Sequence, residues 1–136
     1  MTDLFTGFPL RAFAPSREFT SFLSKRGEIW DIDLNPTRGQ EINKVRPAFV
    51  LSSDSIGKLR LKIVVPITEW QDSFEGNLWH IPLCPAATNG LSKSSAADAF
   101  QVRSLSMERF VRCRGRVGNQ ELEEVIQPLA AVVELS

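Results

Sequence analysis

Short apolar segments, separated by clusters of turn-forming residues, dominate this chain. The segment EIWDIDL alternates, with Trp30, Ile32 and Leu34 on one face and two aspartates on the other, which is typical of a half-buried strand. The segment LRLKIVVPIT contains a continuous apolar run, which indicates burial on both faces. Such segments predict a small, strongly bent sheet. The predicted strands are 28–34, 47–53, 59–68, 77–83 and 98–105.

The hydrophobic period changes after the last predicted strand. Segment 106–111 is predicted as a single helical turn, and the segment from Gly118 onward as a helix with Asn119 as its N-cap. Glutamates in the first turns suit the positive end of the helix dipole. Pro128 predicts a kink or a break, because proline inside a helix costs roughly 3 kcal/mol. The predicted fold class is mainly β with a C-terminal helix (α+β), the helix closing the sheet.

The length of 136 residues, 43% of them hydrophobic, suits one domain with a sizeable core. Residues 1–24 differ from the rest, because they hold five of the nine phenylalanines and show no obvious period. We interpret them as an irregular N-terminal arm whose phenylalanines dock on the body. A misassigned start or a partly disordered tail explains the same composition. The domain itself is predicted over residues 25–136.

Net charge gives no information about partners, because sixteen basic and sixteen acidic residues cancel. The charge is nevertheless uneven, since segment 103–116 carries five arginines and one acid, while the segment from Asn119 to the end carries four glutamates and no base. A solvated loop followed by an acidic helix face explains this pattern. A local cationic surface that engages phosphate or an acidic partner explains it equally well.

Cysteine and histidine usage leaves little material for a metal site. Cys84 and Cys113 are far apart, and His80 is the only histidine. We therefore expect no cofactor and a metal-independent mechanism. There is no secretory hydrophobic region and no apolar run near eighteen residues, the length that suits a membrane span, so we expect a cytoplasmic protein without membrane contact.

Arg46 and Pro47 stand directly before an apolar run, and a long loop, 35–44, precedes them. Proline cannot donate a ladder hydrogen bond, so Pro47 belongs at a strand start or edge, and it keeps Arg46 out of the helical region. The guanidinium is thereby held at the rim of the sheet, where its fork of donors suits a phosphate. A surface ion pair, for example with Glu41, is the competing interpretation.

Thr68 ends the third predicted strand, where a hydroxyl can stabilise developing charge on a nearby oxygen. The common alternative for a threonine at a strand end is a role as strand former or cap. His80 lies in an alternating segment without neighbouring ligands, which indicates a satisfied core or surface histidine. No serine or cysteine is paired with it, so nucleophilic triad chemistry has no support.

Several stretches, taken in order, resemble the MazF/PemK family, the toxins of bacterial type II toxin–antitoxin modules, also called mRNA interferases. They are RGEIWDIDLNPTRGQEINKVRPAFVLSSD, VVPIT, GLSKSSAADAFQVRSL and the acidic-apolar last helix. The resemblance runs from about Lys25 to the end of the chain. Its specific part is the order and spacing of the opening RGEIW, the pattern of Pro36, Gly39 and Glu41, and the RP before a strand.

The resemblance implies a small SH3-like barrel of about five to seven strands that works as a homodimer and binds a cognate antitoxin. It implies sequence-selective cleavage of single-stranded mRNA without a metal, in which the 2′-hydroxyl attacks phosphorus and leaves 2′,3′-cyclic phosphate and 5′-hydroxyl ends. Arg46 matches the catalytic arginine, Thr68 the catalytic Thr or Ser, and Glu41 a loop acid that is a candidate base. RNA contacts are implied at Arg38, Lys44, Trp70, Gln101 and Arg103.

Three of these residues keep alternatives. Trp70 stacks a base or is a core or interface tryptophan, and Gln101, like Arg103, is structural or contacts RNA. The acidic part of an antitoxin tail would suit the arginine-rich segment 103–116.

The chain also departs from the family pattern. Some relatives use an aspartate and an arginine two residues apart, and these positions hold Phe100 and Asp98 here, so that catalytic pair is absent. A non-catalytic toxin of the same fold that binds DNA gyrase is therefore a rival, as is an inactive relative that only binds an antitoxin. Arg46 and Thr68 argue against both rivals, although the missing pair keeps the second one open.

Overall fold

The computed structural model describes residues 24–42, 44–56 and 59–135, so nearly all of the predicted arm, 1–24, lies outside the described residues. Within them, seven strands form one antiparallel sheet in the order β4-β5-β3-β2-β1-β7, and β6 pairs with β3. The strands are β1 (Glu28–Asp33), β2 (Val45–Val50), β3 (Leu61–Glu69), β4 (His80–Leu83), β5 (Ser95–Asp98), β6 (Arg103–Ser106) and β7 (Phe110–Arg116).

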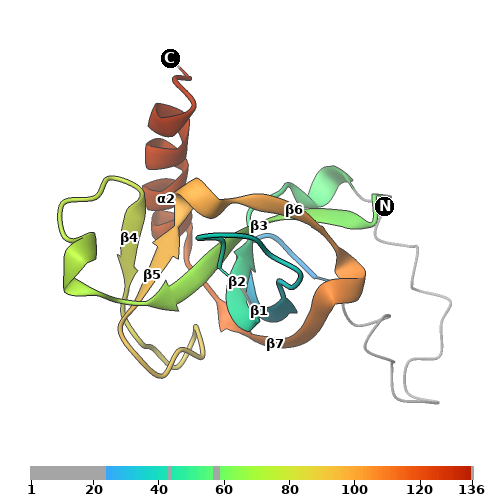
Figure 1. The fold of residues 1–136 in the computed structure, drawn as a ribbon. Helices are drawn as coiled ribbons and strands as arrows, with labels where there is room; N and C mark the ends of the chain where they lie inside the picture. Colours follow the sequence, from blue (N-terminus) through green and yellow to red (C-terminus); the bar gives the residue numbers. More distant parts are fainter. Residues whose placement is uncertain (1–23, 43, 57–58, 136) are drawn as a thin grey trace, which may run out of the picture.

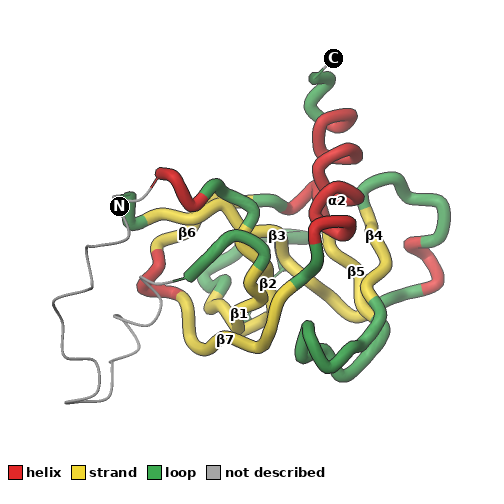
Figure 2. The backbone as a smooth tube through the Cα atoms, turned by 180° about the vertical axis from the view of Figure 1, so that it is seen from behind, coloured by secondary structure: helices red, strands yellow, loops and turns green. Residues whose placement is uncertain are grey.

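The α-helix α2 (Asn119–Val132) follows β7 at the C-terminal end of the described chain. It stands at the part of the sheet formed by β4 and β5, as the two opposite views show (Figures 1 and 2). The predicted mainly-β fold with a C-terminal helix is therefore confirmed. The sheet is not closed, because β4 and β7 are its two ends and do not pair with each other. No helix in the described residues is both long and apolar enough to cross a membrane.

Strand β3 is the centre of the fold. Its residues 64–67 are almost completely buried, which confirms the prediction of burial on both faces. One edge of β3 pairs with β2, while the other pairs first with β6 and then with β5. The sheet has a hydrophobic core on each face. Leu122 and Val125 of α2 cover the first core, which includes Ile29, Phe49, Val65, Ile67 and Ala97. The second core includes Trp30, Ile32, Leu34, Val50, Val64 and Phe110.

The structure differs from the predicted elements between residues 95 and 116. The segment predicted as one strand, 98–105, is divided into β5, a 3-10 turn (Ala99–Gln101) and β6. The chain turns there because the Asp98 carboxylate accepts a hydrogen bond of 3.0 Å from the Phe100 N–H. The predicted helical turn is confirmed as Met107–Arg109, but the sequence did not predict β7. Two register shifts between β1 and β7 obscure the alternation that marks a strand.

The helix α2 also corrects two predictions. Its N-cap is Gly118, whose N–H donates to Glu121 Oε1 at 2.8 Å, and Asn119 is already the first helical residue. The break predicted at Pro128 does not occur, because the helix continues to Val132. The proline leaves the carbonyl of Glu124, four residues earlier, without its helical donor. Glu124 is exposed, so water can satisfy that carbonyl.

We expect Pro128→Ala to raise the free energy of unfolding by about 1–3 kcal/mol, because alanine restores the missing donor and removes the ring clash. Urea unfolding measures the change. The control is Gln127→Ala, an exposed neighbour in the same helix, which should stay within about 0.5 kcal/mol of the wild type. A less stable Pro128→Ala variant would contradict the expectation and show that the packing of the proline ring matters more.

Candidate active site

The β2–β3 ladder ends at two prolines, and the edge of β3 is open beyond them. Ala48 and Pro66 form its last pair, and neither Pro66 nor Pro47 has an N–H to donate. The same register, continued by two residues, places Arg46 opposite Thr68. Arg46 therefore occupies the predicted rim of the sheet, although β2 begins one residue earlier, at Val45.

A pocket of about 200 Å³, here called the cationic pocket, lies at this open edge. Three cationic side chains and one carboxylate line it, so its formal charge is +3 − 1 = +2. The carboxylate of Glu69 lies 3.9 Å from the ammonium of Lys93, and both side chains are largely exposed. Such a pocket suits an anion of low volume. Its lining includes Arg46, Thr68, Glu69, Lys93, Ser95 and Arg114.

Arg46 lines this pocket, and its side chain makes no hydrogen bond to the described residues. Its Nε is buried and has no hydrogen-bond partner among the described residues. The competing ion pair with Glu41 is not found, and no described residue forms an ion pair with Arg46. A buried donor without a partner costs about 1–3 kcal/mol. The donor has no contact with solvent, so an acceptor in the cationic pocket satisfies it only if the side chain shifts.

A second pocket of about 440 Å³, the aromatic pocket, adjoins the cationic pocket at Thr68. The rings of Phe74 and His80 stack at 3.7 Å, and those of Trp79 and Phe100 meet nearly edge to face at 5.7 Å. Flat apolar surfaces of this kind can take a planar ring. Its lining includes Gln40, Thr68, Phe74, Trp79, His80 and Phe100.

His80 lines the aromatic pocket, and both of its ring nitrogens have polar partners. Its Nε2 lies 3.4 Å from Asp98 Oδ2, and its Nδ1 lies 3.2 Å from the amide nitrogen of Asn77. The neutral ring satisfies both contacts when Nε2–H donates to Asp98 and the Asn77 amide donates to Nδ1. The side chain is only 9% exposed. This arrangement agrees with the prediction of a satisfied histidine.

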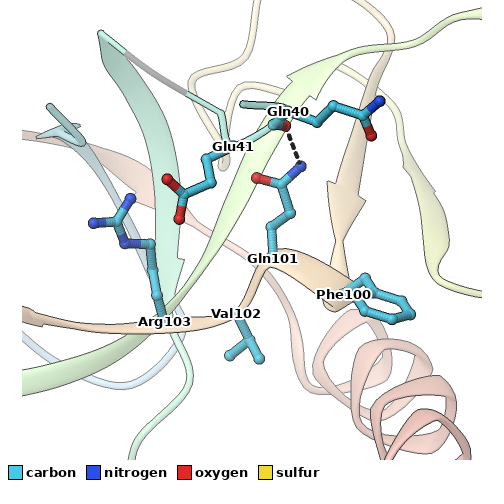
Figure 3. Close-up of a pocket in the computed structure, with 6 residues that line it drawn as sticks. All are labelled: Gln40, Glu41, Phe100, Gln101, Val102 and Arg103. Carbon is cyan, nitrogen blue, oxygen red and sulfur yellow. Dashed lines mark hydrogen bonds between the residues drawn. The ribbon is translucent and has the colours of Figure 1, made fainter. Parts of the chain in front are cut away.

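A third pocket of about 400 Å³, the loop pocket, shares Gln40, Phe100 and Gln101 with the aromatic pocket. Figure 3 shows Glu41 and Arg103 on one side of it and Phe100 on the other. The three pockets are therefore neighbours in one series, joined first by Thr68 and then by Gln101. This series, here called the pocket track, could hold an extended chain.

Gln101 fixes the loop that borders the pocket track. Its Oε1 accepts from the Ile42 N–H at 2.7 Å. Its Nε2 donates to the Gln40 carbonyl at 3.2 Å, as Figure 3 shows. Both bonds join the turn after β5 to the loop 35–44, about sixty residues away in sequence. The Gln101 side chain therefore holds the backbone of this loop in place beside the loop pocket.

Comparison with known proteins identifies the family. Residues 25–133 match the family described as PemK-like, MazF-like toxin of type II toxin-antitoxin system. The chain belongs to this family. Among its relatives, the endoribonuclease MazF9 of Mycobacterium tuberculosis is 35% identical over 123 residues, which cover 83% of this chain and 98% of that protein.

Solved structures of MazF proteins share the fold of this chain. The crystal structure of MazF from Deinococcus radiodurans has a TM-score of 0.68 at 25% identity, covering 82% of this chain and 96% of that one. A MazE–MazF structure from the same organism has a TM-score of 0.63 at 26% identity, covering 83% and 96%. The family and fold predicted from the motifs are thus confirmed.

The predicted site residues do not all lie in one pocket. Arg46 and Thr68 share the cationic pocket, whereas Glu41 lines the loop pocket, where its Oε1 accepts from the Arg38 N–H. Arg38 and Lys44 are exposed on the loop 35–44. Arg103 also lines the loop pocket. The roles predicted for these residues stay predictions.

Trp70 lies beside the aromatic pocket and not in its lining. Its ring packs edge-on against Phe74 at 5.7 Å, and its backbone N–H donates to the Ser94 carbonyl. Trp79 and Phe100, to which the sequence assigned no binding role, line the pocket in its place. Phe100 is exposed because it lies in the turn after β5, which the sequence did not predict.

The arginine-rich segment 103–116 is not a solvated loop, because it forms β6, a 3-10 turn and β7. Four of its five arginines contact β1 or the residues that follow it. Arg103 donates to the Leu34 carbonyl at 3.3 Å, and Arg109 donates to the carbonyls of Asp33 and Asn35. Arg112 and Arg114 both bind the Asp31 carboxylate. These contacts help to hold β1, β6 and β7 together, and Arg114 alone among these four lines the cationic pocket.

The remaining candidate groups give no sign of nucleophilic or metal chemistry. Burial, with a smaller contribution from Glu28, raises the pKa of the Cys113 thiol, so the thiol stays protonated at neutral pH. Burial lowers the pKa of Lys62, which lines none of the three pockets. Within the described part of the chain, no three His, Cys, Asp or Glu side chains gather as metal ligands would.

We expect Gln101→Ala to accelerate hydrogen exchange of the Ile42 amide about tenfold, because the variant removes the acceptor of that amide. Exchange followed by NMR measures the effect. Gln71→Ala is the matched control, since Gln71 lines the aromatic pocket but makes no side-chain hydrogen bond to the described residues. Unchanged exchange at Ile42 in Gln101→Ala would refute the structural role of the amide.

Proposed function

We propose that this toxin is a sequence-selective endoribonuclease that cleaves single-stranded mRNA without a metal ion. The observation that carries the proposal is the pairing of Arg46, with its unpartnered Nε, and Thr68 in one cationic pocket at the open edge of β3. The relative MazF9, an endoribonuclease that matches most of this chain, supports the same reading. The phosphate that is cut binds in the cationic pocket.

The reaction requires charge stabilisation more than any covalent chemistry from the protein. The 2′-oxygen attacks the adjacent phosphorus while the bond from phosphorus to the 5′-oxygen breaks. The products are a 2′,3′-cyclic phosphate and a 5′-hydroxyl, because a base takes the 2′-proton and the leaving 5′-oxygen takes a proton from water. Arg46 neutralises the negative charge that gathers on the phosphorane, and the Thr68 hydroxyl donates to a non-bridging oxygen. Arginine stays protonated at all relevant pH values, so we assign it this electrostatic role and not that of a general acid.

The pocket track explains why the substrate is a chain and not a single nucleotide. With the phosphate beside Thr68, a neighbouring base reaches the aromatic pocket, where Trp79 and Phe100 offer stacking surfaces. Base–aromatic stacking contributes about 1–3 kcal/mol per base. The next nucleotide reaches the loop pocket, where Arg103 lies on one side. Because single-stranded RNA has splayed bases, it can follow this track, whereas a duplex cannot.

The attack also requires a general base that removes the 2′-proton. Glu41 keeps the role implied by the resemblance, but it lines the loop pocket and not the cationic pocket. RNA bound along the pocket track would have to bring its 2′-oxygen close to that carboxylate. The loop 35–44 also carries Arg38 and Lys44, which we assign to contacts with the phosphate backbone.

We further propose a homodimer and a cognate antitoxin as partners, in the cytoplasm. The MazE–MazF structure from Deinococcus radiodurans, which is 26% identical to this chain, supports a protein partner of this kind. Leu61 and Ile63 are more than 40% exposed on one face of β3, as a protein interface requires. The rival is a toxin that binds DNA gyrase or only an antitoxin, and neither function needs an unpartnered Arg46 beside Thr68.

We expect Arg46→Ala to lower the cleavage rate at least about a hundredfold, because the variant removes the main stabiliser of the phosphorane. The assay incubates purified protein with a long synthetic single-stranded RNA and maps the fragment ends by primer extension and mass spectrometry. Cuts by the wild type should recur at one short motif and carry 2′,3′-cyclic phosphate. A fully active Arg46→Ala protein would refute the assignment of Arg46 as a catalytic residue.

The pair Thr68→Ser and Thr68→Val serves as an internal control in the same assay. Serine keeps the hydroxyl and should keep most of the cleavage, whereas valine keeps the shape and should lose it. Dimer formation and antitoxin binding should survive in Arg46→Ala. If the wild-type protein leaves the RNA intact, the result would favour a toxin that binds DNA gyrase or a relative that only binds an antitoxin.

We expect EDTA to leave the cleavage rate unchanged, because Arg46 and Thr68 supply the charge stabilisation that a metal ion would otherwise give. The measurement compares initial rates on the same RNA with and without the chelator, after dialysis of the protein against EDTA. Loss of activity that returns on addition of a divalent cation would contradict the metal-free mechanism.

A further inference from the structure

We propose that Arg114 is a second phosphate-binding arginine of this site, so that a phosphate of the RNA backbone lies between the Arg46 and Arg114 guanidinium groups. The proposal rests on the endoribonuclease function above and extends it to a residue on a different strand. Arg46 comes from β2 and Arg114 from β7, and both line the cationic pocket. Two guanidinium groups in one small pocket match the several oxygens of a phosphate.

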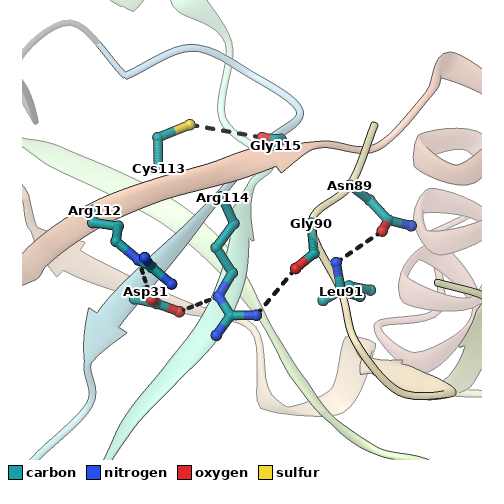
Figure 4. Close-up of polar contacts among 8 residues, drawn as sticks. All are labelled: Asp31, Asn89, Gly90, Leu91, Arg112, Cys113, Arg114 and Gly115. Carbon is teal, nitrogen blue, oxygen red and sulfur yellow. Dashed lines mark hydrogen bonds and ion pairs between the residues drawn. The ribbon is translucent and has the colours of Figure 1, made fainter. Parts of the chain in front are cut away.

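Contacts on two sides hold the Arg114 guanidinium in place. Its Nε donates to Asp31 Oδ1 at 2.7 Å, and its Nη1 donates to the Gly90 carbonyl at 3.2 Å (Figure 4). The Asp31 side chain is 13% exposed, so this ion pair is partly protected from solvent. These contacts use two of the five N–H donors, and Nη2 has no hydrogen-bond partner among the described residues. The group is therefore oriented before any ligand binds.

A close approach between two backbones brings the Gly90 carbonyl within reach. A Cβ on Gly90 would lie 2.4 Å from the Arg114 carbonyl oxygen, and a Cβ on Gly115 would lie 2.4 Å from that of Thr88. Only glycine permits this contact. Asn89 is 2% exposed and holds the loop from inside, since its Oδ1 accepts from the N–H groups of Ala86 and Leu91. The loop that carries Lys93 therefore packs closely against β7.

Arg112 provides an internal comparison, because it contacts the same carboxylate without reaching the pocket. Its Nε lies 3.1 Å from Asp31 Oδ2, but its side chain is 67% exposed and does not line the cationic pocket. A purely structural role in joining β7 to β1 would apply to both arginines. Exposure of an oriented guanidinium to the cationic pocket applies to Arg114 and not to Arg112. The two variants can therefore separate phosphate binding from strand anchoring.

The first test uses the wild-type protein and inorganic phosphate. NMR follows the Nε–Hε signals of Arg46, Arg112 and Arg114 during a phosphate titration. We expect the signals of Arg46 and Arg114 to shift along one saturation curve while that of Arg112 stays in place. An Arg114 signal that does not move, whether or not that of Arg46 does, overturns the proposal. This test needs no variant, so it does not depend on folding of an altered protein.

The second test measures binding of a fully 2′-O-methylated single-stranded oligonucleotide, which has no free 2′-hydroxyl to attack. The plot of log Kd against log salt concentration should lose about 0.7 of its slope in Arg114→Gln, the contribution of one phosphate contact. Arg114→Lys should keep the slope, and Arg112→Gln is the control that should not change it. Equal slopes for Arg114→Gln and Arg112→Gln overturn the proposal, even if both variants cleave RNA more slowly.

The results also separate this proposal from the endoribonuclease function. If the wild type leaves RNA intact while the NMR shifts and the slope change are found, the phosphate role of Arg114 stands and the endoribonuclease function fails. If cleavage depends on Arg46 while Arg114→Gln keeps the wild-type slope, the function stands and the role of Arg114 fails. If both hold, Arg114→Gln should cleave RNA about ten- to a hundredfold more slowly than Arg112→Gln, since a hydrogen bond to a charged group is lost.

Discussion

The burial of β3 on both faces is the constraint from which the rest of the structure follows. A strand that is buried on both faces must satisfy its backbone groups through its edges, so β3 pairs with β2 along one edge and with β6 and β5 along the other. The pairing of β2 with β3 ends at Ala48 and Pro66, next to Pro47. The open edge that results is where the cationic pocket forms, so the same strand supplies both the core and the candidate site.

The cationic side chains of this neutral protein have two different uses. Most arginines of segment 103–116 bind carbonyls or a carboxylate of β1 and the following loop, and such bonds fix the outer strands. Arg46 instead keeps a buried donor without a partner. In our proposal Arg114 belongs to both groups, because Asp31 and Gly90 hold its guanidinium and the residue lines the cationic pocket. Structural ion pairs can in this way orient a group for binding a ligand.

Local sequence predicted the strands well where packing and local pattern agree. The alternation at Trp30, Ile32 and Leu34 and the continuous run ending at Ile67 both reflect which faces are buried, so they identified β1 and β3. β7 was missed because bulges against β1 break its alternation. The turn after β5 was missed because it depends on one side-chain hydrogen bond of Asp98. The helix crosses Pro128 because the propensity cost of a single residue does not outweigh the packing of Leu129, which follows the proline and lies against the same core as Leu122 and Val125.

The sequence by itself determined the family, the mainly-β class and the rim position of Arg46, because motif spacing and the geometry of proline are local properties. Only the tertiary structure decided which groups meet. Arg46 and Arg114 are 68 residues apart in the chain, and they share a pocket because β1 lies between β2 and β7 and supplies Asp31. It also decided that Glu41 faces Gln101 and Arg103 in another pocket, since a side-chain amide fixes the loop 35–44 across the sheet. Contacts between distant segments arise from packing and pairing register, which no short stretch of sequence encodes.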